Sequence, residues 1–106
     1  MIDGVIEIRG LRCDGIRIDV WVRADVSRAA ASDDLADAID IALLASVTRA
    51  TVNVLPGVPA GRMAAQAARA LLTRFPDVTE SRVRITVRRP VGVHADAETV
   101  EVVLCR

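Results

Sequence analysis

Residues 32–42 read SDDLADAIDIA, an acidic stretch that leads directly into an apolar segment with helical periodicity. Four aspartates alternate there with Leu35, Ile39 and Ile41. The last of them, Asp40, is a natural N-cap, because its carboxylate can accept hydrogen bonds from the free N–H groups of a helix's first turn. The stretch therefore predicts a helix that begins at Ile41.

Apolar spacing after this stretch predicts two consecutive helices. The first carries one apolar stripe and is stopped by Pro56-Gly57 and Pro59; the stripe is Ile41, Leu44, Ala45, Thr48, Val52 and Leu55. The second helix is expected from about Ala60 to Phe75, where Pro76 ends it. Its apolar residues are Met63, Ala64, Ala67, Leu71, Leu72 and Phe75.

Alternating residues on both sides of the helical region predict two β-hairpins. The first pairs Val5–Arg12 with Ile16–Ala24 through a tight turn at Asp14-Gly15. A short turn or helical bend at Ser27–Ala31 follows it. The second hairpin joins the strand around Val83, Ile85 and Val87 to a closing strand at Thr99–Cys105, through an irregular connection that contains His94.

The predicted order is strand–strand–helix–helix–strand–strand in a single domain, residues 1–106, of the α+β class. One face of a four-stranded antiparallel sheet is aliphatic, and we expect both helices to cover it. The other face carries charges of both signs: Glu7, Arg9, Arg17, Asp19, Arg23, Arg82, Arg84, Arg88 and Glu101. It is either a solvated face or the inner wall of a barrel made when the sheets of several subunits join edge to edge.

The charge balance excludes some functions. Fourteen basic and fourteen acidic residues cancel, which gives no general attraction to nucleic acid or to an anionic membrane. The arginine-rich strand at Arg82, Arg84 and Arg88 has no stacking aromatics and the wrong strand order for a common RNA-binding sheet. Every basic residue is arginine, so lysine Schiff-base chemistry is absent.

Cysteine usage and hydropathy predict a reduced, cytoplasmic setting. Cys13 and Cys105 are expected to be small core residues, and with one histidine they do not form a metal-ligand set. No leader-like start and no apolar run of membrane-spanning length is present, so we expect no membrane association. We expect no metal and no cofactor.

Several segments together resemble the dihydroneopterin aldolase family. They are IEIRGL at residues 6–11, IDV at 18–20 with Asp25 and Ala29-Ala30, the acidic stretch SDDLADAID, and VRRP at 87–90. The resemblance implies the tunnelling fold, in which subunits form a ring-shaped homo-oligomer, a tetramer or an octamer. It also implies pterin- and folate-type metabolism and a small planar, pterin-like heterocycle as ligand, bound between subunits.

The chain departs from the family at the positions that carry its chemistry. The family has a catalytic glutamate in a long segment between the first two strands, where this chain has only Cys13-Asp14-Gly15. The family's site tyrosine corresponds to Ile41, and its catalytic lysine corresponds to Arg89. The glutamate that holds the pterin ring corresponds to Gly61. The substrate-binding positions implied by the resemblance are Ile41, Ala60, Gly61, Arg62 and Arg89.

These departures favour a protein that lacks the standard catalytic residues. Such a protein would bind a pterin-like ligand or serve as a non-catalytic subunit. In the second case it could assemble with a complete paralogue that supplies the missing residues. A carboxylate would accept from both N–H groups on the pterin's edge, and Gly61 offers only backbone. The alternative is an active, aldehyde-lyase-type or other enzyme on a pterin-like or anionic heterocycle, with Arg89 and His94 as candidate catalytic residues. In that case Arg62 and Arg89 would form an anion pocket; otherwise they are exposed arginines or make salt bridges between subunits.

Overall fold

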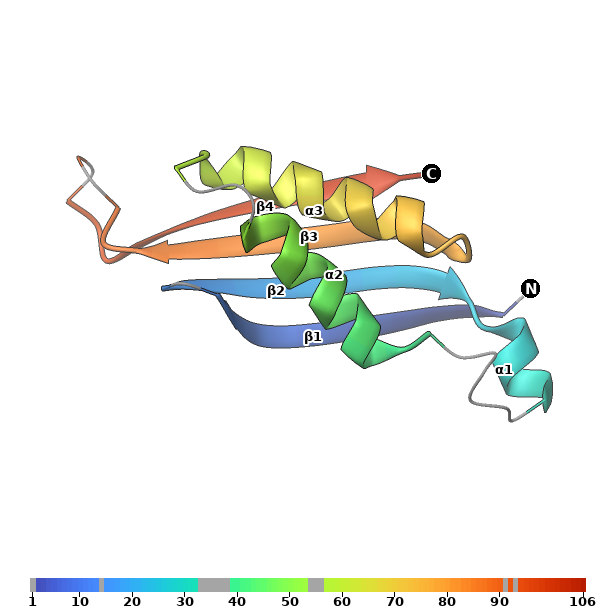
Figure 1. The fold of residues 1–106 in the computed structure, drawn as a ribbon. Coiled ribbons are helices and arrows are strands. Elements are labelled where there is room, and N and C mark those ends of the chain that lie inside the picture. The colour runs from blue at the N-terminus through green and yellow to red at the C-terminus, as the bar shows by residue number, and fades with distance from the viewer. Residues whose placement is uncertain (1, 14, 33–38, 54–56, 91, 93) are drawn as a thin grey trace.

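The computed structural model describes residues 2–13, 15–32, 39–53, 57–90, 92 and 94–106. Within these ranges it contains four strands and three helices (Figure 1). In chain order they are β1 Asp3–Cys13, β2 Ile16–Asp25, α1 Ser27–Ser32, α2 Ile41–Asn53, α3 Ala60–Arg74, β3 Val78–Arg88 and β4 Ala97–Cys105. The predicted α+β order is confirmed, with the bend after β2 formed as the short helix α1.

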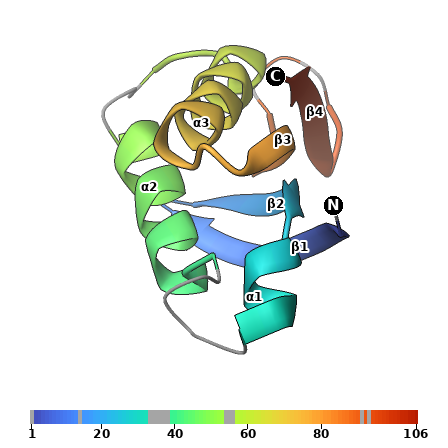
Figure 2. The same cartoon turned by 90° about the vertical axis from the view of Figure 1, so that its right-hand side faces the viewer.

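The strands form one antiparallel sheet in the order β1-β2-β3-β4, so β1 and β4 are its two edges. Figure 2 shows α2 and α3 packed on one side of this sheet. The short helix α1 lies beyond the end of β2 (Figure 1). The opposite face is free of helices in the described part of the chain, and we call it the open face.

The core lies between the sheet and the two long helices and is almost entirely aliphatic. Each fully buried valine, leucine or isoleucine contributes about 1.5–3 kcal/mol to the free energy of folding. Small residues on α3 let this helix approach β3 closely, and the buried Ser81 hydroxyl donates a 2.7 Å hydrogen bond to the Ala68 carbonyl there. The fully buried aliphatic side chains are Ile18, Val20, Val22, Leu44, Leu71, Val78, Val83 and Ile85.

A β-bulge in β1 changes which residues of this strand face the core. Ile8 pairs with Val20, but the next pair is Leu11 with Ile18, so β1 has one more residue than β2 at this point. Gly10 occupies the bulge with a φ of 74°, a left-handed conformation that glycine adopts without strain. Its N–H donates a 2.8 Å hydrogen bond to the Asp19 carboxylate. The bulge turns Leu11 into the core and Arg12 toward the open face.

The predicted cap of the second helix is confirmed. The Asp40 carboxylate accepts hydrogen bonds from the N–H groups of Ala42 and Leu43, at 2.9 and 3.2 Å. The other aspartates of the acidic stretch, within residues 33–38, lie outside the described residues. So do Asp14 of the predicted turn and the pair Leu55 and Pro56 at the predicted end of this helix.

Two predicted bounds were wrong, and so was the predicted burial of one cysteine. The closing strand begins at Ala97 rather than Thr99, and α3 ends at Arg74 because Phe75 is already extended, with a φ of −118°. Cys13 is buried as predicted, but Cys105 is exposed. The reason is the two-residue period of the strand, which turns Leu104 toward the helices and Cys105 away from them.

Candidate functional site

Ala60, Gly61 and Arg62 form the first turn of α3, which begins after Pro59 without a side-chain cap. This turn contains no acidic residue. A Cβ atom placed on Gly61 would lie 3.5 Å from Val100 Cγ1, which is an ordinary van der Waals contact. A side chain at position 61 would therefore project toward the edge strand β4.

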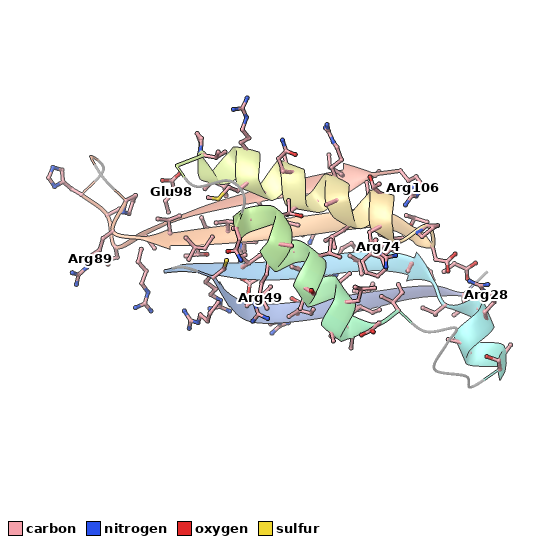
Figure 3. All side chains as sticks on the ribbon, viewed as in Figure 1. Arg28, Arg49, Arg74, Arg89, Glu98 and Arg106 are labelled. Carbon is pink, nitrogen blue, oxygen red and sulfur yellow. The ribbon has the colours of Figure 1, made fainter. Side chains whose placement is uncertain are left out.

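Arg89 and His94 lie in the connection between β3 and β4, and both have left-handed backbones, with φ values of 49° and 51°. This conformation costs a non-glycine residue roughly 1–2 kcal/mol. The Arg89 N–H donates a 2.8 Å hydrogen bond to the Asp96 carbonyl, which holds the turn together. Figure 3 shows Arg89 at the end of the sheet where α3 begins.

Ile41 is the first residue of α2, and its side chain is 57% exposed, so it does not belong to the buried stripe that was predicted from it. The buried stripe begins at Leu44. The helix α2, which Ile41 begins, starts on the side of the molecule nearer α1, away from the end of β3 that leads into the Arg89 turn (Figure 1). Within one chain, the structure therefore groups the α3 turn with Arg89 and leaves Ile41 apart from them.

A basic cavity of about 470 Å³ lies next to Arg89. Its lining residues do not include Arg62 or His94, so it differs from the anion pocket considered from the sequence. Among the described residues, four arginines and one aspartate line it, in the set Arg12, Gly15, Arg17, Thr86, Arg88, Arg89, Asp96 and Ala97.

The centre of the open face forms a second charged cavity of about 510 Å³, but its charges are largely paired. Arg9 lies 2.9 Å from Glu7, and Arg17 lies 3.2 Å from Asp19. The hydrogen bond from Arg9 lowers the pKa of Glu7 below its ordinary value. Glu7 therefore stays ionised near neutral pH and is a poor proton donor.

Trp21 provides an aromatic surface in this central cavity. The guanidinium carbons of Arg82 and Arg23 lie 4.8 and 5.3 Å from its ring centroid, within the range of cation–π attraction. The alternation in β2 puts Trp21 on the same face as Arg17 and Asp19, but the sequence alone does not show which arginines stack on it. The indole ring of Trp21 therefore already makes cation–π contacts with two arginines of the same chain.

Glu98 is a further acidic residue of interest, on the edge strand β4. It is the second residue of β4 and lies two positions before Val100, so both side chains project from the same face of the sheet. Figure 3 shows Glu98 beneath the beginning of α3. The signal was available, since the alternation of Val100 and Val102 extends back to Glu98, but the strand was predicted to start one residue later.

Two negative findings apply to the described residues. In these ranges no three histidine, cysteine, aspartate or glutamate side chains come together as a group that could hold a metal ion. No helix in the same ranges is long and apolar enough to cross a membrane.

Buried Cys13 donates a 2.9 Å hydrogen bond from its Sγ to the Asn53 side-chain oxygen.

Comparison with known proteins gives one family. The family model FolB, dihydroneopterin aldolase, matches residues 6–105. No curated protein sequence matches the chain significantly.

Solved structures share the fold over nearly the whole chain. Dihydroneopterin aldolase from Escherichia coli, solved with neopterin, is 21% identical with a TM-score of 0.73, covering 95% of this chain and 98% of that one. Dihydroneopterin aldolase from Burkholderia thailendensis, solved with guanine, is 17% identical with a TM-score of 0.77, covering 98% and 92%. Urate oxidase from Bacillus subtilis is 10% identical with a TM-score of 0.65, and 95% of this chain matches 44% of its length.

Proposed function

Because the chain belongs to the dihydroneopterin aldolase family and has its tunnelling fold, we propose that it binds a pterin-like heterocycle without carrying out the family's standard aldolase reaction. The observation that carries this proposal is the first turn of α3. It contains Gly61 where the resemblance places the carboxylate that holds the ring, and it contains no acidic residue. The planar ligands of the two similar aldolases, neopterin and guanine, suggest the class of heterocycle.

The loss of the standard reaction follows from proton chemistry. Retro-aldol cleavage removes a proton from a hydroxyl group and later returns one to the ring, so it needs groups that exchange protons near neutral pH. Arg89 stays protonated over this range, and Ile41 has no ionisable group. These two residues stand at the positions that the resemblance assigns to the catalytic lysine and the site tyrosine.

The binding site is proposed to lie between subunits of a homo-oligomeric ring. Both edge strands, β1 and β4, are long, and exposed apolar side chains lie on or next to them, including Val5 at 53% and Val103 at 43%. Unpaired edges of this kind favour pairing with another chain. Ring closure would bring the exposed Ile41 of one subunit toward the α3 turn of its neighbour.

The test is to titrate the purified protein with neopterin and, in parallel, to incubate it with dihydroneopterin. We expect saturable neopterin binding and no formation of 6-hydroxymethyl-dihydropterin above the buffer rate. Absence of neopterin binding by a correctly assembled protein would refute the ligand class. Measurable aldol cleavage would refute the loss of the standard reaction.

The basic cavity favours a second candidate, an enzyme that acts on an anionic heterocycle through Arg89. In this case the arginines hold the anion, and His94, which lies in the same connection but does not line the cavity, is the candidate base. Loss of turnover in Arg89→Ala, with the assembly unchanged, would favour this candidate. No turnover across a panel of pterins and purines would exclude it in favour of binding alone.

A further inference from the structure

We propose that the basic cavity at the Arg89 end of the open face binds the phosphate group of a small phosphorylated ligand. Arg12 from β1, Arg17 from β2, Arg88 from β3 and Arg89 from the following turn all line it. The ring of this ligand would be the pterin-like heterocycle of the proposed function. The identity of the ring rests on that function, but the anion site does not.

Three of these guanidinium groups are available for a ligand. Among the described residues, no carboxylate forms an ion pair with Arg12, Arg88 or Arg89. Arg17 has a partner in Asp19, at 3.2 Å. Three cations that form no ion pair with a described carboxylate attract an anion of more than one charge.

The strand register brings like charges together instead of separating them. Arg12 is directly opposite Arg17, an arrangement of equal charges that destabilises a sheet. Arg17 in turn is opposite Thr86, and Arg88 lies two residues further along β3 on the same face. Sheets ordinarily avoid such a row, and an anion bound across it would remove the repulsion.

The row also supplies neutral hydrogen-bonding groups. The Thr86 hydroxyl lies 3.1 Å from the Thr99 hydroxyl of β4, and Thr86 lines the cavity. A phosphate offers several acceptor oxygens, which suit the fork of two or more guanidinium groups and a nearby hydroxyl. A carboxylate has two oxygens and one charge, so it would leave most of these donors unused.

The test uses the intact protein and inorganic pyrophosphate, measured by isothermal titration calorimetry at low ionic strength. We expect saturable binding that Arg12→Gln and Arg88→Gln each weaken roughly tenfold or more, since each removes a charge-assisted hydrogen bond. Arg69→Gln is the matched control, because it removes the same charge from an exposed position on α3, away from the cavity. Malonate, a dicarboxylate, is expected to bind at least tenfold more weakly than pyrophosphate.

Three results would overturn the proposal: no saturable pyrophosphate binding, an equal loss in Arg69→Gln, or malonate binding as tight as that of pyrophosphate. Neopterin, titrated into the same variants, separates this site from the proposed function. Pyrophosphate binding that depends on Arg12 supports the anion site whether or not neopterin binds. Neopterin binding without pyrophosphate binding refutes the anion site and leaves the proposed function intact.

Discussion

Replacing Gly61 by glutamate tests the proposal that a carboxylate at this position would make the chain a stronger pterin binder. Position 61 is the second residue of α3, and a Cβ there makes an ordinary contact of 3.5 Å with Val100, so a side chain can begin at this position without displacing its neighbour. The carboxylate would accept hydrogen bonds from both N–H groups on the edge of the heterocycle. We expect neopterin to bind Gly61→Glu about 2 kcal/mol more tightly, roughly thirtyfold, after the cost of ordering the side chain.

The same substitution should also stabilise the fold, for a separate reason. Glutamate is a better helix former than glycine by about 0.5 kcal/mol, and an acid in the first turn adds about 0.3–1 kcal/mol through the helix dipole. The first turn of α3 now holds no acid. A total of about 1 kcal/mol corresponds to a rise in Tm of roughly 4 °C for a chain of this size.

Two controls separate the effects on binding and on stability. Gly61→Ala gives at least the same gain in helix propensity and adds no carboxylate, so it should raise Tm without changing neopterin affinity. Gly61→Gln matches the shape of glutamate but accepts only one of the two hydrogen bonds. The assay is a fluorescence titration with neopterin on protein of confirmed assembly state. If Gly61→Glu binds neopterin no more tightly than Gly61→Gln, position 61 does not face the ring and the reasoning fails.

Three further predictions follow from local geometry. Arg89→Gly should raise the free energy of unfolding by about 0.5–1 kcal/mol, because glycine adopts the left-handed backbone without strain. The same substitution should weaken pyrophosphate binding. Urea unfolding measures the first effect and calorimetry the second, and a loss of stability would contradict the prediction. Asp40→Ala should cost about 1 kcal/mol through loss of the N-cap, measured by the same urea unfolding, and an unchanged midpoint would show that the cap is dispensable. Hydrogen bonds from Ser27 lower the pKa of Asp25, so Asp25 stabilises the fold above its ordinary pKa of about 4, and this contribution is lost as the pH falls below that value. The difference in Tm between the wild type and Asp25→Asn should therefore shrink in acid. A difference that is independent of pH would contradict this prediction.

The sequence predicted most of the fold because its signals are local. Alternation in β2 and the N-cap at Asp40 depend only on residues close together in the chain, and both were confirmed. The start of β4 was misplaced because Glu98 interrupts the apolar pattern where the strand begins. A single chain thus determines its elements well wherever burial and periodicity agree.

The candidate site was harder to predict because it depends on register. From the sequence, Arg89 was paired with Arg62, which lies near it in the expected family site. The cavity instead joins Arg89 to arginines of β1, β2 and β3, which become neighbours only through strand pairing. The predicted turn at Asp14-Gly15 already implies that Arg12 pairs with Arg17, but the pairing of β2 with β3, which adds Arg88 and Arg89, leaves no signal in the spacing along the chain.

The bulge at Gly10 connects the core to the chemistry of the open face. Upstream of it, Ile6 and Ile8 face the helices; with uninterrupted alternation, Arg12 would follow them into the core, and burying its charge without a partner would be very costly. The extra residue instead gives the core Leu11 and places Arg12 opposite Arg17. One insertion therefore both completes the apolar core and creates the like-charged row, so the arginine cavity is tied to the register on which the stability of the fold depends.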